Sequence, residues 1–176
     1  MDKNALQYKD ENDRSYGLAG MAISLYVWDG EEYLIGLDLD ADPGDGLSVS
    51  PAFNFGGNPR VSARSVWKEM VKHLQMSTAM LLGNVMCRSY CAPGGARRLS
   101  SQTTALMRAM VRDEGRELCS LDDDEIAEIF DQTLSYLERL YANTAVATIA
   151  DSLSSALRTR RSLSAAEALD FLARLR

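Results

Sequence analysis

The chain has 176 residues, 46% of them apolar, and a formal net charge of −6 with a pI of about 4.8. This length is typical of one domain, and the acidic balance disfavours general nucleic-acid binding, which depends on clustered Lys and Arg. No apolar run approaches the roughly 20 residues of a membrane span, and the polar residues 1–14 carry no export or transit signal. We therefore expect a cytoplasmic protein without a membrane partner.

Charge is distributed unevenly along the chain. Residues 1–60 contain eleven Asp and Glu against four Lys and Arg, whereas residues 61–176 contain fourteen acids and fifteen bases. The change coincides with Gly56-Gly57-Asn58-Pro59, a stretch that interrupts regular structure. We expect a single domain over 1–176, built from an acidic hairpin or irregular subregion (1–60) and a helical subregion (61–176).

Residues 21–40 are ambiguous between strand and helix. Apolar residues alternate on both sides of Asp29-Gly30, a dipeptide favoured in tight hairpin turns, and this pattern predicts a β-hairpin with the arms Ile23-Leu25-Val27 and Tyr33-Ile35-Leu37-Leu39. Met21, Leu25 and Trp28 also fall at helical spacing, so a helix interrupted at Gly30 is the alternative. The turn cluster at 42–46 ends this region, and 47–55 is expected to add a short extended segment.

The remainder has helical periodicity. One helix is predicted from about Ser62 until Pro93-Gly94-Gly95, and another from about Ser101 to Glu114, closing at Gly115 as its antiparallel neighbour. Ser120 is the predicted N-cap of the next helix, within an apolar stripe over 121–158 that forms either one helix or two, divided at Asn143-Thr144. Ser164 and Glu167 match a capping box, which predicts a short terminal helix.

These elements predict a mainly α fold: four to five helices in a bundle-like domain with a small N-terminal β-hairpin or irregular layer. A wholly helical chain is the alternative. No internal repeat suggests a solenoid.

The acidic turn offers the first candidate site. Asp38, Asp40 and Asp42 place carboxylates at alternate positions before a glycine-rich turn, as calcium loops do. The loop pattern fails where it requires Gly and Glu, because Pro43 and Val49 stand there. A solvated strand edge explains the same residues, so we predict no metal site and keep these three residues as the only candidate ligands.

The sulfur and imidazole groups do not form a recognisable metal site. Cys87 and Cys91 lie four residues apart, but His73 would be about 21 Å away along the same helix, and Cys119 would have to fold back to join them. We expect ordinary reduced thiols and no cofactor. Nucleophilic catalysis would have to use His73, the only histidine, and no nucleophile elbow or nucleotide-binding glycine motif accompanies it.

Two sets of arginines could bind an acidic partner, although a solvated and charge-balanced face is the simpler interpretation. Arg108, Arg112 and Arg116 line one helical face, and a second set follows later as Arg158, Arg160 and Arg161. We expect a cytoplasmic interaction or assembly module without catalytic activity, binding itself or another protein. The alternatives are a small-molecule or divalent-ion-binding enzyme or sensor that uses 38–46, with its ligand between the acidic hairpin and the helices, and a nucleic-acid regulator.

Overall fold

The computed structural model describes residues 6–42, 44–53 and 63–175, and the Gly56-Gly57-Asn58-Pro59 break lies outside them. The mainly α prediction is confirmed: six α-helices and a small three-stranded sheet account for the fold of the described residues. The sheet removes the wholly helical alternative. The helices are α1 (Glu11–Val27), α2 (Ala63–Tyr90), α3 (Ser101–Cys119), α4 (Asp123–Tyr141), α5 (Thr144–Arg160) and α6 (Ala165–Leu172), and the strands are β1 (Leu34–Asp38), β2 (Leu47–Val49) and β3 (Ser162–Ser164).

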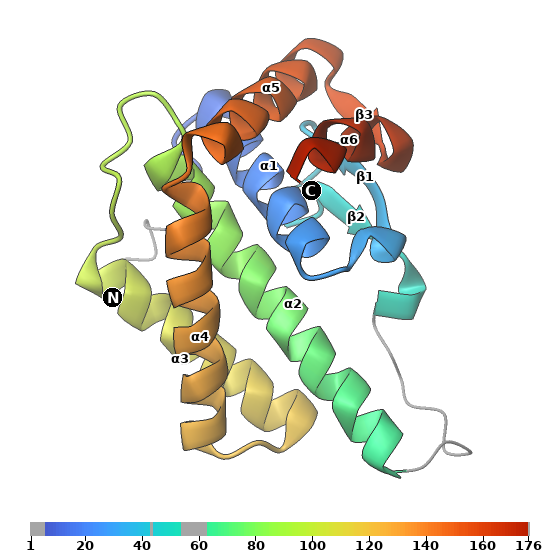
Figure 1. Cartoon of the computed structure of the whole chain (residues 1–176), viewed down its shortest axis with the longest axis vertical. Helices are drawn as coiled ribbons and strands as arrows, with labels where there is room; N and C mark the ends of the chain where they lie inside the picture. Colours follow the sequence, from blue (N-terminus) through green and yellow to red (C-terminus); the bar gives the residue numbers. More distant parts are fainter. Residues whose placement is uncertain (1–5, 43, 54–62, 176) are drawn as a thin grey trace.

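Helix α1 lies in the middle of the fold, between α2, α5 and the sheet (Figure 1). Its N-cap is Asp10, whose carboxylate accepts the backbone N–H of Asp13 at 2.7 Å. The helix is buried almost all round, over 15–20 and 22–26. Because a helix packed on every side needs no polar face, its sequence does not show a clean helical period.

The predicted first arm of the hairpin is therefore wrong, since 23–27 belong to α1. The Asp29-Gly30 pair forms the C-terminal turn of that helix. Asp29 adopts a positive φ of 54°, and the Gly30 N–H donates to the Leu25 carbonyl at 3.0 Å. Residues that suit a tight hairpin suit a helix end equally well, because both need a left-handed backbone position.

The second predicted arm is confirmed as β1, and the expected extended segment after the turn supplies β2 over its first three residues. The strand order is β2-β1-β3, with both pairs antiparallel. Strand β3 was not predicted. It is three residues long, and Leu163 is its buried residue, opposite Leu37 of β1.

Helix α2 begins and ends close to its predicted limits, but α3 runs past Gly115 to Cys119. Gly115 is needed for packing, because a Cβ there would lie 2.8 Å from Ile126 Cγ1. Ser120 is not the N-cap of α4 as predicted: with a φ of 51° it is the left-handed C-cap of α3. The N-cap of α4 is Asp122, whose N–H donates to the Glu125 carboxylate at 3.0 Å.

The stripe over 121–158 divides into two helices, α4 and α5. Asn143 is the N-cap of α5, and its side-chain oxygen accepts the Ala145 N–H at 2.9 Å. The predicted capping box of Ser164 and Glu167 is confirmed at the start of α6. Of the helices in the described residues, none has the length and apolar character that crossing a membrane requires.

Candidate functional site

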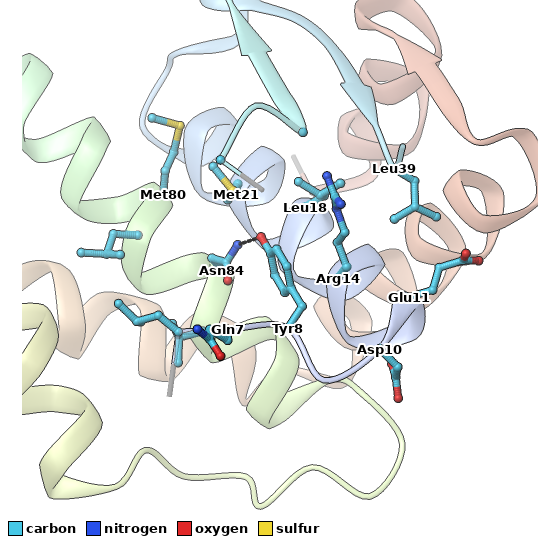
Figure 2. Close-up of a pocket in the computed structure, with 15 residues that line it drawn as sticks. Gln7, Tyr8, Asp10, Glu11, Arg14, Leu18, Met21, Leu39, Met80 and Asn84 are labelled. Carbon is cyan, nitrogen blue, oxygen red and sulfur yellow. Dashed lines mark hydrogen bonds between the residues drawn. The ribbon is translucent and has the colours of Figure 1, made fainter. Parts of the chain in front are cut away.

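A cavity of about 790 Å³ lies between α1, α2, the segment 6–10 and the segment 39–46, of which all residues but 43 are described (Figure 2). Most of its wall is apolar. Leu18 and Met21 come from α1, Met80 and Leu81 from α2, and Leu39 from the end of β1. Met21 and Leu81 are only partly buried, so apolar surface faces the open space.

Arg88 of α2 fixes the segment 6–10 against the helices. It is almost fully buried, and its Nη2 pairs with the Asp13 carboxylate at 2.6 Å and donates to the Gln7 carbonyl at 2.7 Å. Its guanidinium lies 4.9 Å from the centre of the Tyr8 ring. This network gives the cavity a rigid wall, because a buried charge keeps its partners in place.

Tyr8 contributes a polar group to that wall. Its hydroxyl oxygen accepts from Asn84 Nδ2 at 2.7 Å, and Asn84 Oδ1 in turn accepts from Arg88 Nη1 at 3.4 Å. The amide of Asn84 therefore has its orientation set from one side by a donor-only guanidinium. It follows that the Tyr8 hydroxyl acts as an acceptor toward Asn84 and keeps its own hydrogen for another partner.

Arg14 of α1 is the unusual charged group of the site. Its Nη2 donates to the Ala41 and Asp42 carbonyls, the latter at 3.3 Å, and so ties the segment 39–46 to α1. Among the described residues it forms no ion pair with a carboxylate, and its buried Nε makes no hydrogen bond. Its charge helps to lower the pKa of Asp40, but that carboxylate forms its ion pair with Arg161.

The carboxylates nearest the cavity are already used. Asp10 caps α1, and Glu11 pairs with Arg161 at 2.7 Å. Figure 2 shows the side chains of both directed outward, away from Tyr8 and Asn84. The lining therefore presents Arg14 as its cation and an apolar wall beside it.

The acidic candidate residues are not gathered into one site. Asp38 accepts the Asp40 N–H at 2.8 Å, whereas the Asp40 carboxylate pairs with Arg161, whose hydrogen bonds hold the pKa of Asp40 below its ordinary value. Asp42 approaches Arg14 through its carbonyl rather than its carboxylate. No three His, Cys, Asp or Glu side chains in the described part of the chain are placed to hold a metal ion.

The three cysteines divide between two places. Cys87 and Cys91 share a hydrogen bond at the end of α2. Cys119 lies instead with His73 in a second cavity, of about 290 Å³. There Ser77 Oγ donates to the Glu114 carboxylate at 2.8 Å.

The predicted basic faces are charge-balanced. On α3, Arg108 pairs with Asp131 and Arg116 with Asp123. Each arginine of the later group also has a partner: Arg158 binds Asn12, Arg160 pairs with Glu167, and Arg161 pairs with Glu11 and Asp40. The simpler of the two sequence-based interpretations, a solvated and largely charge-balanced face, agrees with these contacts.

Sequence reasoning missed the residues that characterise the larger cavity, namely Tyr8, Arg14 and Asn84. One signal was present: Arg14 is one of only four basic residues in the first 60. The chain matches no protein family, no curated protein and no solved structure.

Proposed function

We propose that this chain binds a small, largely apolar molecule in the cavity between α1, α2 and the segment 39–46. The observation that supports this is the cavity itself, whose 790 Å³ fall within the range of about 300–1,000 Å³ common among ligand sites. Its apolar walls with a few polar groups are also what such sites share. The location agrees with one sequence-based alternative, a ligand between the acidic segment and the helices.

The free energy of binding would come mainly from covering apolar surface. Met21 and Leu81 are partly exposed, and each 100 Å² of apolar area removed from water contributes about 2.5 kcal/mol. Methionine side chains adapt to the shape of a ligand because they are unbranched and flexible. Met21 and Met80 therefore favour a ligand with an aliphatic or similarly adaptable body.

The test uses decanol, an uncharged apolar probe, and isothermal titration calorimetry on the full chain. Leu81→Trp fills the cavity and is expected to weaken decanol binding about tenfold or more, because the indole occupies the space of the probe. Leu140→Trp on α4 is the matched control, a partly buried leucine outside the cavity. The proposal fails if decanol does not bind, or if both variants bind it as the unmodified chain does.

Protein binding is the second candidate, and the large apolar side chains on the surface favour it. Leu118 is 57% exposed and Trp67 48% exposed, on α3 and α2. Self-association, or binding to another protein in the cytoplasm, remains a prediction. Sedimentation analysis of the unmodified chain and of Leu118→Ser tests it, and a monomer in both cases would count against self-association.

A further inference from the structure

We infer that the ligand of the larger cavity is an acid, an aliphatic carboxylate whose anionic group binds Arg14 and Tyr8. This inference rests on the proposed function and adds the chemical class of the ligand. It begins from a difference between Arg14 and the other arginines around the cavity. Arg88 pairs with Asp13, and Arg161 pairs with Glu11 and Asp40, whereas Arg14 forms no ion pair with a described carboxylate and donates to backbone carbonyls.

The donors of Arg14 are only partly used. Nη2 holds the segment 39–46, the buried Nε has no acceptor, and Nη1 makes no hydrogen bond with the described part of the chain. Nη1 is not a buried atom, so a ligand can reach it. A carboxylate at Nη1 would give Arg14 a direct ion pair and form a charge-assisted hydrogen bond.

Tyr8 offers a second donor beside the first. Since its oxygen accepts from Asn84, its hydrogen is available, and no described residue receives it. The Arg14 guanidinium carbon lies 5.9 Å from the centre of the Tyr8 ring, so the two side chains are neighbours in the cavity wall. Two donors suit the two oxygens of a carboxylate.

The rest of the cavity suits a hydrocarbon chain. Leu18, Met21, Met80 and Leu81 continue the wall from α1 across to α2 and carry no hydrogen-bonding group that a polar ligand would require. A polar body such as a sugar would leave its hydroxyl groups without partners there, at a cost for each. The cavity therefore has one end with a charged group, Arg14, and an apolar remainder.

The acidic residues around the cavity would instead favour a cationic ligand. Asp10, Glu11, Asp42 and the nearby Asp45 would attract a cation at long range. The contacts of these residues argue against a cationic ligand. Asp10 and Glu11 are used within the protein and directed outward, and salt screens the exposed charges over about 8 Å.

The experiment compares three probes of equal chain length on the unmodified protein, each below its micelle concentration: decanoate, decanol and decyltrimethylammonium. Calorimetry at neutral pH is expected to give decanoate an affinity about tenfold or more above that of decanol, with the ammonium weakest. Arg14→Gln is expected to remove that advantage, so that decanoate and decanol bind the variant with affinities within about twofold of each other. Arg108→Gln is the matched control, the same change at an arginine of α3 that neither lines the cavity nor pairs with a carboxylate beside it, and it should leave decanoate binding unaltered.

The outcomes separate the two proposals. Equal binding of decanoate and decanol would overturn the acid inference and leave the proposed function intact, whereas no binding of any probe would overturn both. Tightest binding of the ammonium would show that the acidic segment governs selection and would also overturn the inference. Because the comparison of probes needs no variant, it stands even if Arg14→Gln fails to fold. Tyr8→Phe gives a second check, with a loss for decanoate of a few-fold and none for decanol.

Discussion

Gly20 of α1 and Gly83 of α2 bring the backbones of the two helices into direct contact: a Cβ on Gly83 would lie 2.6 Å from the carbonyl oxygen of Gly20. The same carbonyl accepts from the Tyr141 hydroxyl at 2.9 Å, and that hydroxyl lies 3.0 Å from Ser24 Oγ. The crossing is therefore fixed by both packing and buried hydrogen bonds. It also sets the distance between the two helices that form the cavity wall.

Gly83→Ala is expected to lower the free energy of unfolding by about 2–3 kcal/mol, because the added methyl group forces the helices apart. A loss of stability would be informative, because alanine stabilises an isolated helix by about 1 kcal/mol relative to glycine. Urea denaturation measures the change. Ser155→Ala, at an exposed position of α5, is the control and should stay within about 0.5 kcal/mol; a neutral or stabilising Gly83→Ala would contradict the crossing.

Asp13→Asn is expected to cost about 3 kcal/mol, because it leaves the buried Arg88 guanidinium without its counter-charge. The exposed pair of Arg108 and Asp131 provides the control, and Asp131→Asn should cost at most about 1 kcal/mol. Thermal unfolding of the two variants distinguishes a buried pair from a surface one. Similar losses of stability in the two variants would contradict a stabilising role for the buried Arg88–Asp13 pair.

The ion pair of Asp13 and Arg88 also predicts how the stability of the fold changes at low pH. Burial raises the pKa of Asp13, but the hydrogen bonds from Arg88 and from the Lys9 N–H, together with the charges of Arg88 and Lys9, outweigh it and leave the pKa lowered. A lowered pKa contributes stability that is complete above the unfolded value of about 3.9 and is lost as the pH falls through the folded value. The unmodified chain should therefore lose more stability below about pH 4 than Asp13→Asn does.

His73 is expected to titrate below its ordinary value of about 6.5, because burial against Tyr33 and Phe53 disfavours the imidazolium. Burial is the largest influence, with Glu69 opposing it and Lys72 adding to it. As the pH falls, the unfolded chain takes up the His73 proton at a higher pH than the folded chain does. The contribution of His73 to the stability of the folded state therefore falls as the pH drops below about 6.5. With a single histidine in the chain, proton NMR follows it without ambiguity, and a midpoint at or above 6.5 would refute the expectation.

Cys91 is expected to react with iodoacetamide well before the other two thiols. The hydrogen bond from Cys87 lowers the pKa of Cys91, with Arg97 helping and burial opposing, while burial raises the pKa of Cys87 and of Cys119. Cys87 is also fully buried. Because the thiolate is the reactive form, labelling should follow this order. Mass spectrometry of tryptic peptides separates the three sites, and equal labelling of Cys119 would be the contrary result.

The parts of the fold that sequence predicts well are those with a one-sided apolar pattern and a recognisable cap. Helix α6, with its capping box of Ser164 and Glu167, is of this kind, and the second half of the predicted hairpin became β1. Helix α1 was misread because burial on all sides removes the helical period, and alternating residues such as Ile23, Leu25 and Val27 remain to suggest a strand.

The cavity could not be predicted in the same way. Its lining joins segments that are far apart in the chain, and the role of Arg14 depends on which carboxylates other arginines have already paired with. Such competition for partners is a property of the assembled structure. A single sequence does not contain it as a local pattern.

The position of β3 has a consequence for how the chain is made. Strand β1 has β2 on one edge and depends for its other edge on Ser162–Ser164, so Gly36 meets its partner Ser164 only after more than a hundred further residues have been synthesised. During translation, the acidic first third therefore leaves the ribosome with one strand edge open, and the charges Asp38 and Asp40 on that edge discourage pairing with a neighbouring nascent chain. The sheet can therefore be completed only after the end of α5 and strand β3, which follows it, have been synthesised.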